Sequence, residues 1–400
     1  MDLEQYMYKA EFEKALKIKG YGSYSQNQSY ETIEKTVKLE SGLKVKPKVI
    51  KSLSEYFEFI SSLESTYKNP VFYRGQINAN WLPNPSSLRK NPANEHLMLQ
   101  DFTRYFSDEI DKCKTAMAKL VLMQHFGLGC RCLDISENPL AALYFACQPM
   151  KKFGNTKWEE NEKFFGEIIL FREPENEENE KPDKLKVIDS SNVSIMANTA
   201  FMEPEFSLWH LGSQWKKDVY LGHDENYIDL KSVVRGSLIV RVPQNNPRIK
   251  NQQGAFIIVN ANNIYLENNP DILKDLTQFV IDDEYVTVDN LSTNPQWKNF
   301  FTNKLKPWEI KFNKIIPYDE NNEIKIFRMD PFDLERIFYK NKDGVQQVVL
   351  IPGSCKKRIL QELERFNITE GFIYPDMDNI ANEINEKINV WTFNNKILFR

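Results

Sequence analysis

The chain has 400 residues, of which 41% are hydrophobic and 12% aromatic, which suffices for a folded core and excludes a disordered protein. A formal net charge of −4 excludes an overall positive field that would attract nucleic acid. No apolar run approaches the roughly 20 residues that span a bilayer, and the N-terminus lacks the apolar segment of a signal peptide, so we expect a cytoplasmic protein.

An N-terminal extension is predicted to precede the main domain. Residues 1–43 combine a helical apolar pattern at 2–18 with a polar stretch at 21–30 that is typical of a linker. From about residue 44 the chain changes character, and Val45, Val49 and Ile50 predict a short strand. We therefore place the main domain at residues 44–400.

The main domain is predicted to mix short strands with helices. Short runs rich in β-branched and aromatic residues predict strands over 45–50, 70–75, 166–171, 237–242, 254–259, 346–351 and 371–374. Apolar residues at three- and four-residue spacing predict helices over 52–63, 94–117, 139–147, 354–366 and 376–388. These elements follow one another in an irregular order, so we predict an α+β fold.

Some segments are predicted to lie outside the core. Residues 173–184, EPENEENEKPDK, are acidic and flanked by proline, so we expect a solvated loop. Residues 262–325 are rich in Asn, Asp and Lys and carry only short strand signals, which indicates a peripheral insertion. Residues 248–253 are interpreted as a polar turn before a strand.

The five cysteines show no disulfide framework, because their number is odd and their spacing irregular. Cys130 and Cys132 lie near His125, which is a combination that zinc sites use. Zinc-binding pairs usually have two or more residues between the cysteines, and a second pair is missing here. We therefore interpret both cysteines as small buried thiols in a strand and expect no metal.

Residues 121–147 concentrate the polar residues that a binding site needs. The pattern predicts a loop, a short strand and then a helix that begins at Pro139, whose φ suits a first helical turn. Ser136 or Asn138 could accept hydrogen bonds from the free N–H groups there. These polar groups are therefore expected at the start of a buried helix, a position that favours anions.

This stretch resembles the FRG domain family. The resemblance rests on Gln124-His125-Phe126-Gly127-Leu128 and on Arg131, Leu133, Asp134, Ser136, Asn138, Pro139, Leu140, Ala142, Leu143, Tyr144, Phe145 and Ala146. The aromatic–Arg–Gly signature that names the family stands upstream as Phe72-Tyr73-Arg74-Gly75-Gln76. The resemblance covers roughly residues 45–390.

The FRG family is distantly similar to the ADP-ribosyltransferase fold, in which a split pair of mixed or antiparallel sheets holds NAD. The resemblance therefore implies NAD as a substrate, and transfer of ADP-ribose to a macromolecule or hydrolysis of NAD. In bacteria such a protein would suit a toxin or an anti-phage effector. A non-catalytic module that senses a nucleotide or binds a protein is the alternative that the sequence leaves open.

Three polar positions do the work in that fold, and their matches here are the candidate catalytic residues. An Arg that ends the first strand matches Arg74, and a hydroxyl on the next strand matches Ser136. An Arg beside a glycine can bind phosphate or ribose oxygens in a bidentate way, and the glycine lets a ligand approach the backbone. We expect Arg74 and Ser136 to face each other across a hollow that fits a dinucleotide.

The third position carries a late Glu in active transferases, and Gln252 matches it here. An amide can bond a ribose hydroxyl but adds no negative charge, which favours the non-catalytic alternative. Glu137, Glu203 or Glu205 could supply the carboxylate instead, and the sequence does not choose among them.

Further residues near these positions are candidates for contacts with NAD. They are Tyr73, Gly75, Gln76, His125, Arg131, Asp134, Asn138, Gln253 and Phe256. Structural alternatives apply to several of them. Arg131 and Asp134 could form a buried ion pair that shapes the loop, Asn138 could act only as a helix cap, and Tyr73 and Phe256 could only pack.

Overall fold

A computed structural model gives the structure of the chain. It describes residues 29–38, 44–66, 69–81, 83, 85–89, 95–152, 155–157, 162–173, 186–187, 191–202, 205–207, 235–266, 278–281, 284–287, 324–328, 334 and 337–376. The predicted helix at 2–18, the predicted helix beyond Asp376 and most of the segment 262–325 lie outside these residues. Among the described helices, none has both the length and the apolar character that crossing a membrane requires.

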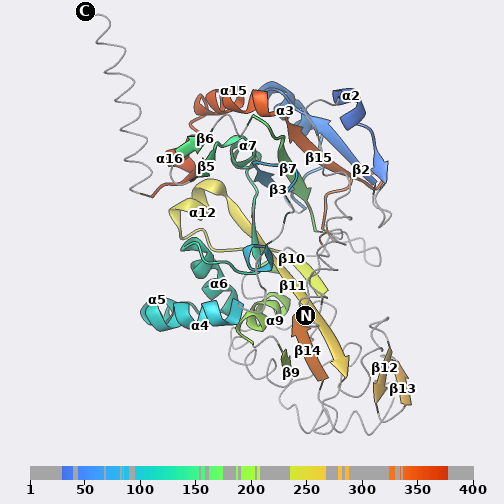
Figure 1. Cartoon of the computed structure of the whole chain (residues 1–400), viewed down its shortest axis with the longest axis vertical. Helices are drawn as coiled ribbons and strands as arrows, with labels where there is room; N and C mark the ends of the chain where they lie inside the picture. Colours follow the sequence, from blue (N-terminus) through green and yellow to red (C-terminus); the bar gives the residue numbers. More distant parts are fainter. Residues whose placement is uncertain are drawn as a thin grey trace, which may run out of the picture.

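One mixed sheet of 11 strands forms the centre of the described chain (Figure 1). Its main path is β1 (Val37–Lys38), β2 (Lys44–Val49), β15 (Val345–Ile351), β7 (Gly166–Phe171), β3 (Phe72–Gln76), β4 (Cys132–Ser136), β11 (Gly254–Leu266), β10 (Arg235–Arg241) and β8 (Lys186–Val187). The pairs β2–β15 and β8–β10 are parallel, and the other pairs of this path are antiparallel. The predicted α+β class is therefore confirmed.

The remaining strands lie beside this path. At its far end, β11 pairs with β14 (Ile324–Arg328), which pairs with β9 (Glu205–Ser207). Two separate hairpins are formed by β5 (Met150–Lys152) with β6 (Asn155–Lys157), and by β12 (Gln278–Ile281) with β13 (Glu284–Thr287). Part of the predicted insertion 262–325 therefore extends the sheet.

The pairing between β3 and β4, in the middle of the sheet, is short. β3 and β4 share one registered pair, Tyr73 with Ser136, whereas β10 and β11 share seven, from Arg235 with Ala261 to Arg241 with Ala255. Two groups of strands are thus joined at a short junction. The ADP-ribosyltransferase-like split of the sheet stays a prediction.

Most of the described helices cover one face of the sheet, in two groups (Figure 1), whereas α2 (Tyr30–Ile33) packs on the other face of β2 and β15. The first group packs on β3, β7 and β15 and comprises α3 (Leu53–Ser61), α7 (Pro139–Cys147), α15 (Gly353–Glu364) and α16 (Glu370–Ile373). The second packs on β4, β10 and β11 and includes α4 (Glu95–Tyr105), α5 (Ser107–Asp111), α6 (Ala116–His125) and α9 (Ser191–Asn198). Alternate residues of a strand point to opposite faces. Accordingly, Cys132 joins the second group, and Leu133 packs with Ile337 on the other face.

The first residues of α7 explain how this helix begins and why it lies close to the sheet. Asn138 caps it, because its side chain accepts a hydrogen bond of 2.9 Å from the Leu140 N–H, and Pro139 follows as expected. Gly75 on β3 allows the close approach, since a Cβ there would lie 1.9 Å from the Ala142 carbonyl oxygen. The predicted strand, cap and helix of the central stretch are therefore confirmed.

Four other predictions are wrong in part, and local caps explain three of them. The predicted helix 94–117 is α4, α5 and the start of α6, and α6 begins anew at the Thr115 cap and extends to His125. The predicted strand 371–374 is α16, because Thr369 accepts from the Phe372 N–H. The predicted turn 248–253 is largely α12 (Pro247–Gln252), capped by Asn246.

The fourth correction concerns the acidic run 173–184. Its first residue, Glu173, is buried instead of solvated, and its carboxylate accepts a hydrogen bond of 2.8 Å from the Ile239 N–H of β10. The rest of this run lies outside the described residues. This hydrogen bond therefore ties the chain to β10 just after the end of β7.

Candidate functional site

β4 is buried along its whole length except at Asp134. Its neighbours Leu133 and Ile135 are 2% and 4% exposed, whereas Asp134 is exposed to solvent. Side chains alternate along a strand, so Asp134 lies on the helix-covered face with Cys132 and Ser136. An ionised carboxylate in a central strand is costly unless water, a counter-charge or a ligand reaches it. The two helix groups therefore leave β4 open at this residue.

Tyr374, at the end of α16, lies beside Asp134. Its hydroxyl donates a hydrogen bond of 3.0 Å to Gln148 Oε1 at the end of α7, and its ring packs edge-on against Phe145. Burial raises the pKa of the Tyr374 hydroxyl, and the negative charges of Glu370 and Asp134 raise it further. The phenol is therefore protonated at neutral pH and close enough to Asp134 to be affected by its charge.

Arg248, in the first turn of α12, lies over the ring of this phenol. Its guanidinium carbon is 5.0 Å from the centre of the Tyr374 ring, and its positive charge opposes the rise in the Tyr374 pKa. We define Asp134, Gln148, Arg248 and Tyr374 as the Asp134–Tyr374 site. A carboxylate and a guanidinium thus both act on one phenol.

Ser136, Asn138 and Gln252, three predicted site residues, hold this site together. The Ser136 hydroxyl accepts from the Asn138 N–H at 2.9 Å and donates to the Gln252 carbonyl oxygen at 2.5 Å. The Gln252 amide donates in turn to the Ile373 carbonyl oxygen at 2.8 Å. These bonds connect the end of β4 to α12 and α16 and so place Tyr374.

Arg74 does not face Ser136 as expected. It lies inside β3, and Tyr73 next to it pairs with Ser136, so alternation directs Arg74 to the opposite face of the sheet. Its Nη1 donates a hydrogen bond of 2.5 Å to the Asp134 carbonyl oxygen. The guanidinium therefore braces the junction of β3 and β4 beneath the exposed carboxylate.

The other signature residues of β3 contact protein. Tyr73 is buried in the core with α7, and the space beside Gly75 is taken by Ala142 of α7 instead of a ligand. The buried Gln76 amide donates to the Trp81 carbonyl oxygen at 2.8 Å and to the Glu167 carboxylate. These contacts favour structural roles for all three residues.

His125, Gln253 and Phe256 lie near the Asp134–Tyr374 site without joining it. His125 ends α6, and its Nε2 is 3.2 Å from the Asn246 amide nitrogen. Gln253 ends α12 with a left-handed φ of 47° and accepts from the Glu137 N–H through its carbonyl. Phe256 is buried and pairs with Asp134 in the ladder. The structural alternative for Phe256, packing, therefore holds.

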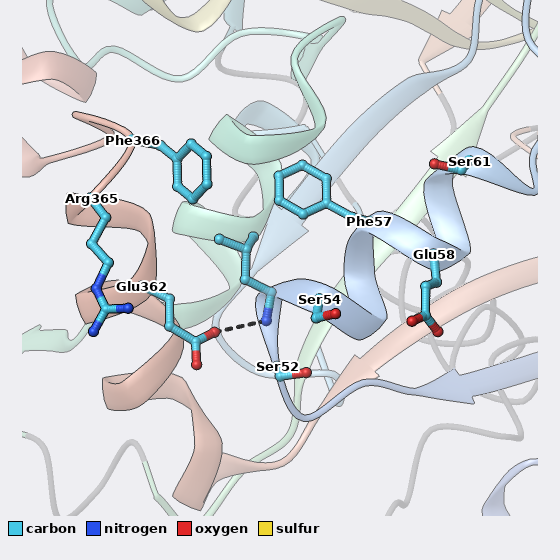
Figure 2. Close-up of a pocket in the computed structure, with 9 residues that line it drawn as sticks. Ser52, Ser54, Phe57, Glu58, Ser61, Glu362, Arg365 and Phe366 are labelled. Carbon is cyan, nitrogen blue, oxygen red and sulfur yellow. Dashed lines mark hydrogen bonds between the residues drawn. The ribbon is translucent and has the colours of Figure 1, made fainter.

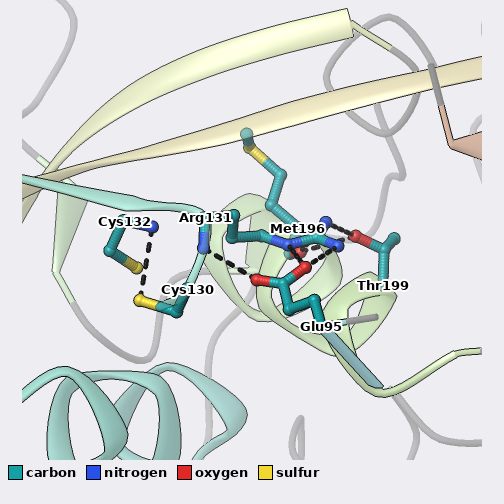
Figure 3. Close-up of polar contacts among 6 residues, drawn as sticks. All are labelled: Glu95, Cys130, Arg131, Cys132, Met196 and Thr199. Carbon is teal, nitrogen blue, oxygen red and sulfur yellow. Dashed lines mark hydrogen bonds and ion pairs between the residues drawn. The ribbon is translucent and has the colours of Figure 1, made fainter. Parts of the chain in front are cut away.

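Arg131 pairs with Glu95 and not with Asp134, which corrects the predicted ion pair (Figure 3). Arg131 Nη2 and backbone nitrogen each lie 2.7 Å from a Glu95 carboxylate oxygen, and Nη1 contacts Thr199 and Met196. The two charged side chains are 4% and 2% exposed. A ligand on the surface cannot reach this guanidinium.

Cys130 and Cys132 lie beside Arg131 in the same buried region (Figure 3). A hydrogen bond from Cys130, together with burial, raises the pKa of the Cys132 thiol. All five cysteines are free, and in the described part of the chain no three His, Cys, Asp or Glu side chains could hold a metal ion. The Cys132 thiol is therefore protonated at neutral pH, and both cysteines are buried.

Of the carboxylates that the sequence offered in place of Gln252, Glu137 is engaged with another side chain. Glu137 forms a bidentate ion pair with Arg241, with distances of 2.7 and 2.9 Å. Glu203 lies outside the described residues, and Glu205 begins β9 beyond the far end of β11. Asp134 is the exposed carboxylate here, a role that the sequence analysis did not give it.

A separate groove of about 580 Å³ lies between α3 and α15 (Figure 2). The rings of Phe57 and Phe366 pack edge-on in its lining, and the Glu362 carboxylate accepts a hydrogen bond of 2.8 Å from the Leu53 N–H. None of the residues that line this groove belongs to the Asp134–Tyr374 site. The groove is therefore a different surface.

The fold and the site define an α+β protein whose polar residues gather over the open part of its central strand. Residues 69–155 match the family model of the FRG domain, and the chain therefore carries an FRG domain. Comparison with curated proteins and comparison with solved structures both gave no match. The matched segment contains Asp134 and Gln148, whereas Arg248 and Tyr374 lie outside it.

Proposed function

We propose that this FRG-domain protein binds NAD at the Asp134–Tyr374 site and cleaves the bond between nicotinamide and ribose. ADP-ribose would pass to a macromolecular acceptor or to water. The observation that carries this proposal is the exposed carboxylate of Asp134 on a strand that is otherwise buried, beside the Tyr374 hydroxyl. Such a reaction would suit a toxin or an anti-phage effector, because it consumes NAD.

The chemistry needs a negative charge close to the ribose. When the bond from C1′ to the nicotinamide nitrogen breaks, its electron pair leaves with nicotinamide, and positive charge develops on the sugar, as in glycoside hydrolysis. The Asp134 carboxylate would stabilise that charge, and the Tyr374 hydroxyl would bond a ribose oxygen. Water or the acceptor then bonds to C1′ and gives up a proton. Asp134 thus supplies the charge that Gln252 lacks.

Asp134→Asn tests this role, because it removes the charge and keeps the shape. Labelled NAD is incubated with the protein and a cell extract, and nicotinamide release and label transfer are measured. We expect kcat to fall about a hundredfold or more, the usual effect of losing an electrostatic contact to a transition state. Asp108→Asn on α5 changes an exposed carboxylate elsewhere and serves as the control. Equal turnover by Asp134→Asn and the native protein would refute the proposal.

A non-catalytic nucleotide-sensing or protein-binding module is the second candidate. It is favoured by the engagement of Arg74, Ser136 and Gln252 with backbone carbonyl groups, which leaves these polar groups fewer bonds for a substrate. The same assay separates the two functions. Saturable binding of NAD by the native protein without nicotinamide release would support the module.

A further inference from the structure

We infer that the Asp134–Tyr374 site binds NAD in one orientation, with the diphosphate at Arg248 and the nicotinamide ribose at Asp134. The choice of NAD rests on the proposed function. The orientation rests on the opposite charges of Arg248 and Asp134, which both act on Tyr374. It assigns a ligand-binding role to Arg248, a residue outside the matched FRG segment.

Opposite charges act on the Tyr374 phenol, and in the described part of the chain no ion pair joins Arg248 to Asp134. The Arg248 guanidinium carbon is 5.0 Å from the ring centre, while the carboxylates of Asp134 and Glu370 act on the hydroxyl. Gln148 bonds the same hydroxyl at 3.0 Å and keeps it in place. The site therefore presents a positive and a negative end to a ligand.

NAD carries a matching pair of charges. Its diphosphate is anionic and its nicotinamide ring is cationic. A guanidinium binds phosphate oxygens through parallel hydrogen bonds, because its planar donors fit them. The reverse orientation would bring phosphate towards Asp134 and Glu370, and like charges repel. Charge complementarity thus selects one direction of binding.

The environment of Arg248 leaves its guanidinium available for an anion. The arginines Arg131 and Arg241 are paired with Glu95 and Glu137, whereas the described residues show no ion pair for Arg248. Its backbone is held, because the Asn246 side chain accepts from its N–H at 2.8 Å. The start of α12 thus holds the Arg248 backbone in place, and its guanidinium lies over Tyr374.

Two variants and two partial ligands test the orientation. ADP carries the diphosphate without the cation, and nicotinamide riboside carries the cation without the diphosphate. Calorimetry on the full chain measures both affinities. We expect Arg248→Gln to weaken ADP binding about tenfold or more, the usual effect of losing charged hydrogen bonds, and to change nicotinamide riboside binding less than about twofold. We expect the reverse pattern for Asp134→Asn.

Lys250→Gln is the matched control, because it removes an exposed charge from the same helix. It is expected to leave both affinities within about twofold of the native values, and thermal unfolding verifies that each variant is folded. Unchanged ADP affinity in Arg248→Gln, or a native protein that binds neither ligand, would overturn the inference. ADP binding that depends on Arg248, without any NAD cleavage, would support the orientation and refute the catalytic proposal.

Discussion

At the scale of residues, charged side chains of this chain meet very different surroundings. Arg131 is enclosed with Glu95, and its charge is neutralised by a partner that lies 36 positions earlier. Asp134 stands in the same segment but is open to solvent. Lys356 of α15 is a third case, because it is fully buried and donates a hydrogen bond of 2.7 Å to the Ile77 carbonyl oxygen. A buried lysine makes stability depend on pH.

Lys356→Met measures that dependence. Burial lowers the pKa of Lys356 from 10.5 to about 8. Between these values the unfolded chain holds a proton that the folded chain has lost, so this group makes stability rise with pH. We expect the free energy of unfolding of the native protein, relative to Lys356→Met, to rise by up to about 3 kcal/mol from pH 8 to 10.5. Urea unfolding at several pH values measures the difference.

In the comparison of the native protein with Lys356→Met, the contributions of other titrating groups to the pH dependence of stability cancel. Burial raises the pKa of Tyr73 to about 12, so Tyr73 lowers stability at high pH, but it does so in both proteins and cancels. Parallel stability curves for the two proteins would contradict the prediction. They would mean that Lys356 has the same pKa in the folded and unfolded chains.

At the scale of elements, the sequence predicted those features that residues close together in the chain determine. The α7 start was predictable, since Asn138 and Pro139 act within one helical turn. The strand predicted over residues 371–374 is instead largely α16, because the three apolar residues Phe372, Ile373 and Tyr374 fit one helical turn and a short strand equally well. The partners of Arg131 and Tyr374 were not predictable, since Glu95 and Gln148 lie 36 and 226 positions away in the chain. The candidate site could therefore not be identified before the fold showed which distant residues lie together.

Gly75→Ala tests the contact that holds α7 against the sheet. The added Cβ would lie 1.9 Å from the Ala142 carbonyl oxygen, so the helix backbone must move. We expect a loss of about 1–3 kcal/mol or more in the free energy of unfolding, the cost of overpacking. Gly254→Ala on β11 is the control, because its nearest contact would be an ordinary 3.4 Å. Equal losses in both variants would show that α7 does not depend on Gly75.

At the scale of the whole molecule, the FRG segment is one part of a larger fold. Residues 69–155 supply β3, β4 and the helices α4 to α7, but β3 pairs mainly with β7, and β4 pairs mainly with β11. Arg248 and Tyr374 also come from later in the chain. The matched segment therefore contains neither a complete sheet nor a complete Asp134–Tyr374 site.

A fragment of residues 69–155 tests this dependence. We expect it to lack cooperative thermal unfolding, because its strands would expose apolar faces and unpaired edges. We also expect no ADP binding by calorimetry, whereas the full chain binds. A fragment that unfolds cooperatively and binds ADP would show that the later strands are dispensable.

The short junction between β3 and β4 has a mechanical consequence. A sheet resists bending through the many hydrogen bonds between its strands. Here β3 and β4 are joined by one registered pair, Tyr73 with Ser136, and by the hydrogen bond from Arg74 to the Asp134 carbonyl oxygen. The ladder therefore contributes little resistance to bending at this seam, and the packing of Phe72 with Leu133 and Ile135 supplies the rest. Asp134 lies on β4, on one side of this seam. Gln148 follows the end of α7, which packs mainly on β3, on the other side. A ligand that binds both Asp134 and Gln148 would therefore connect the two halves of the sheet and make the whole sheet more rigid.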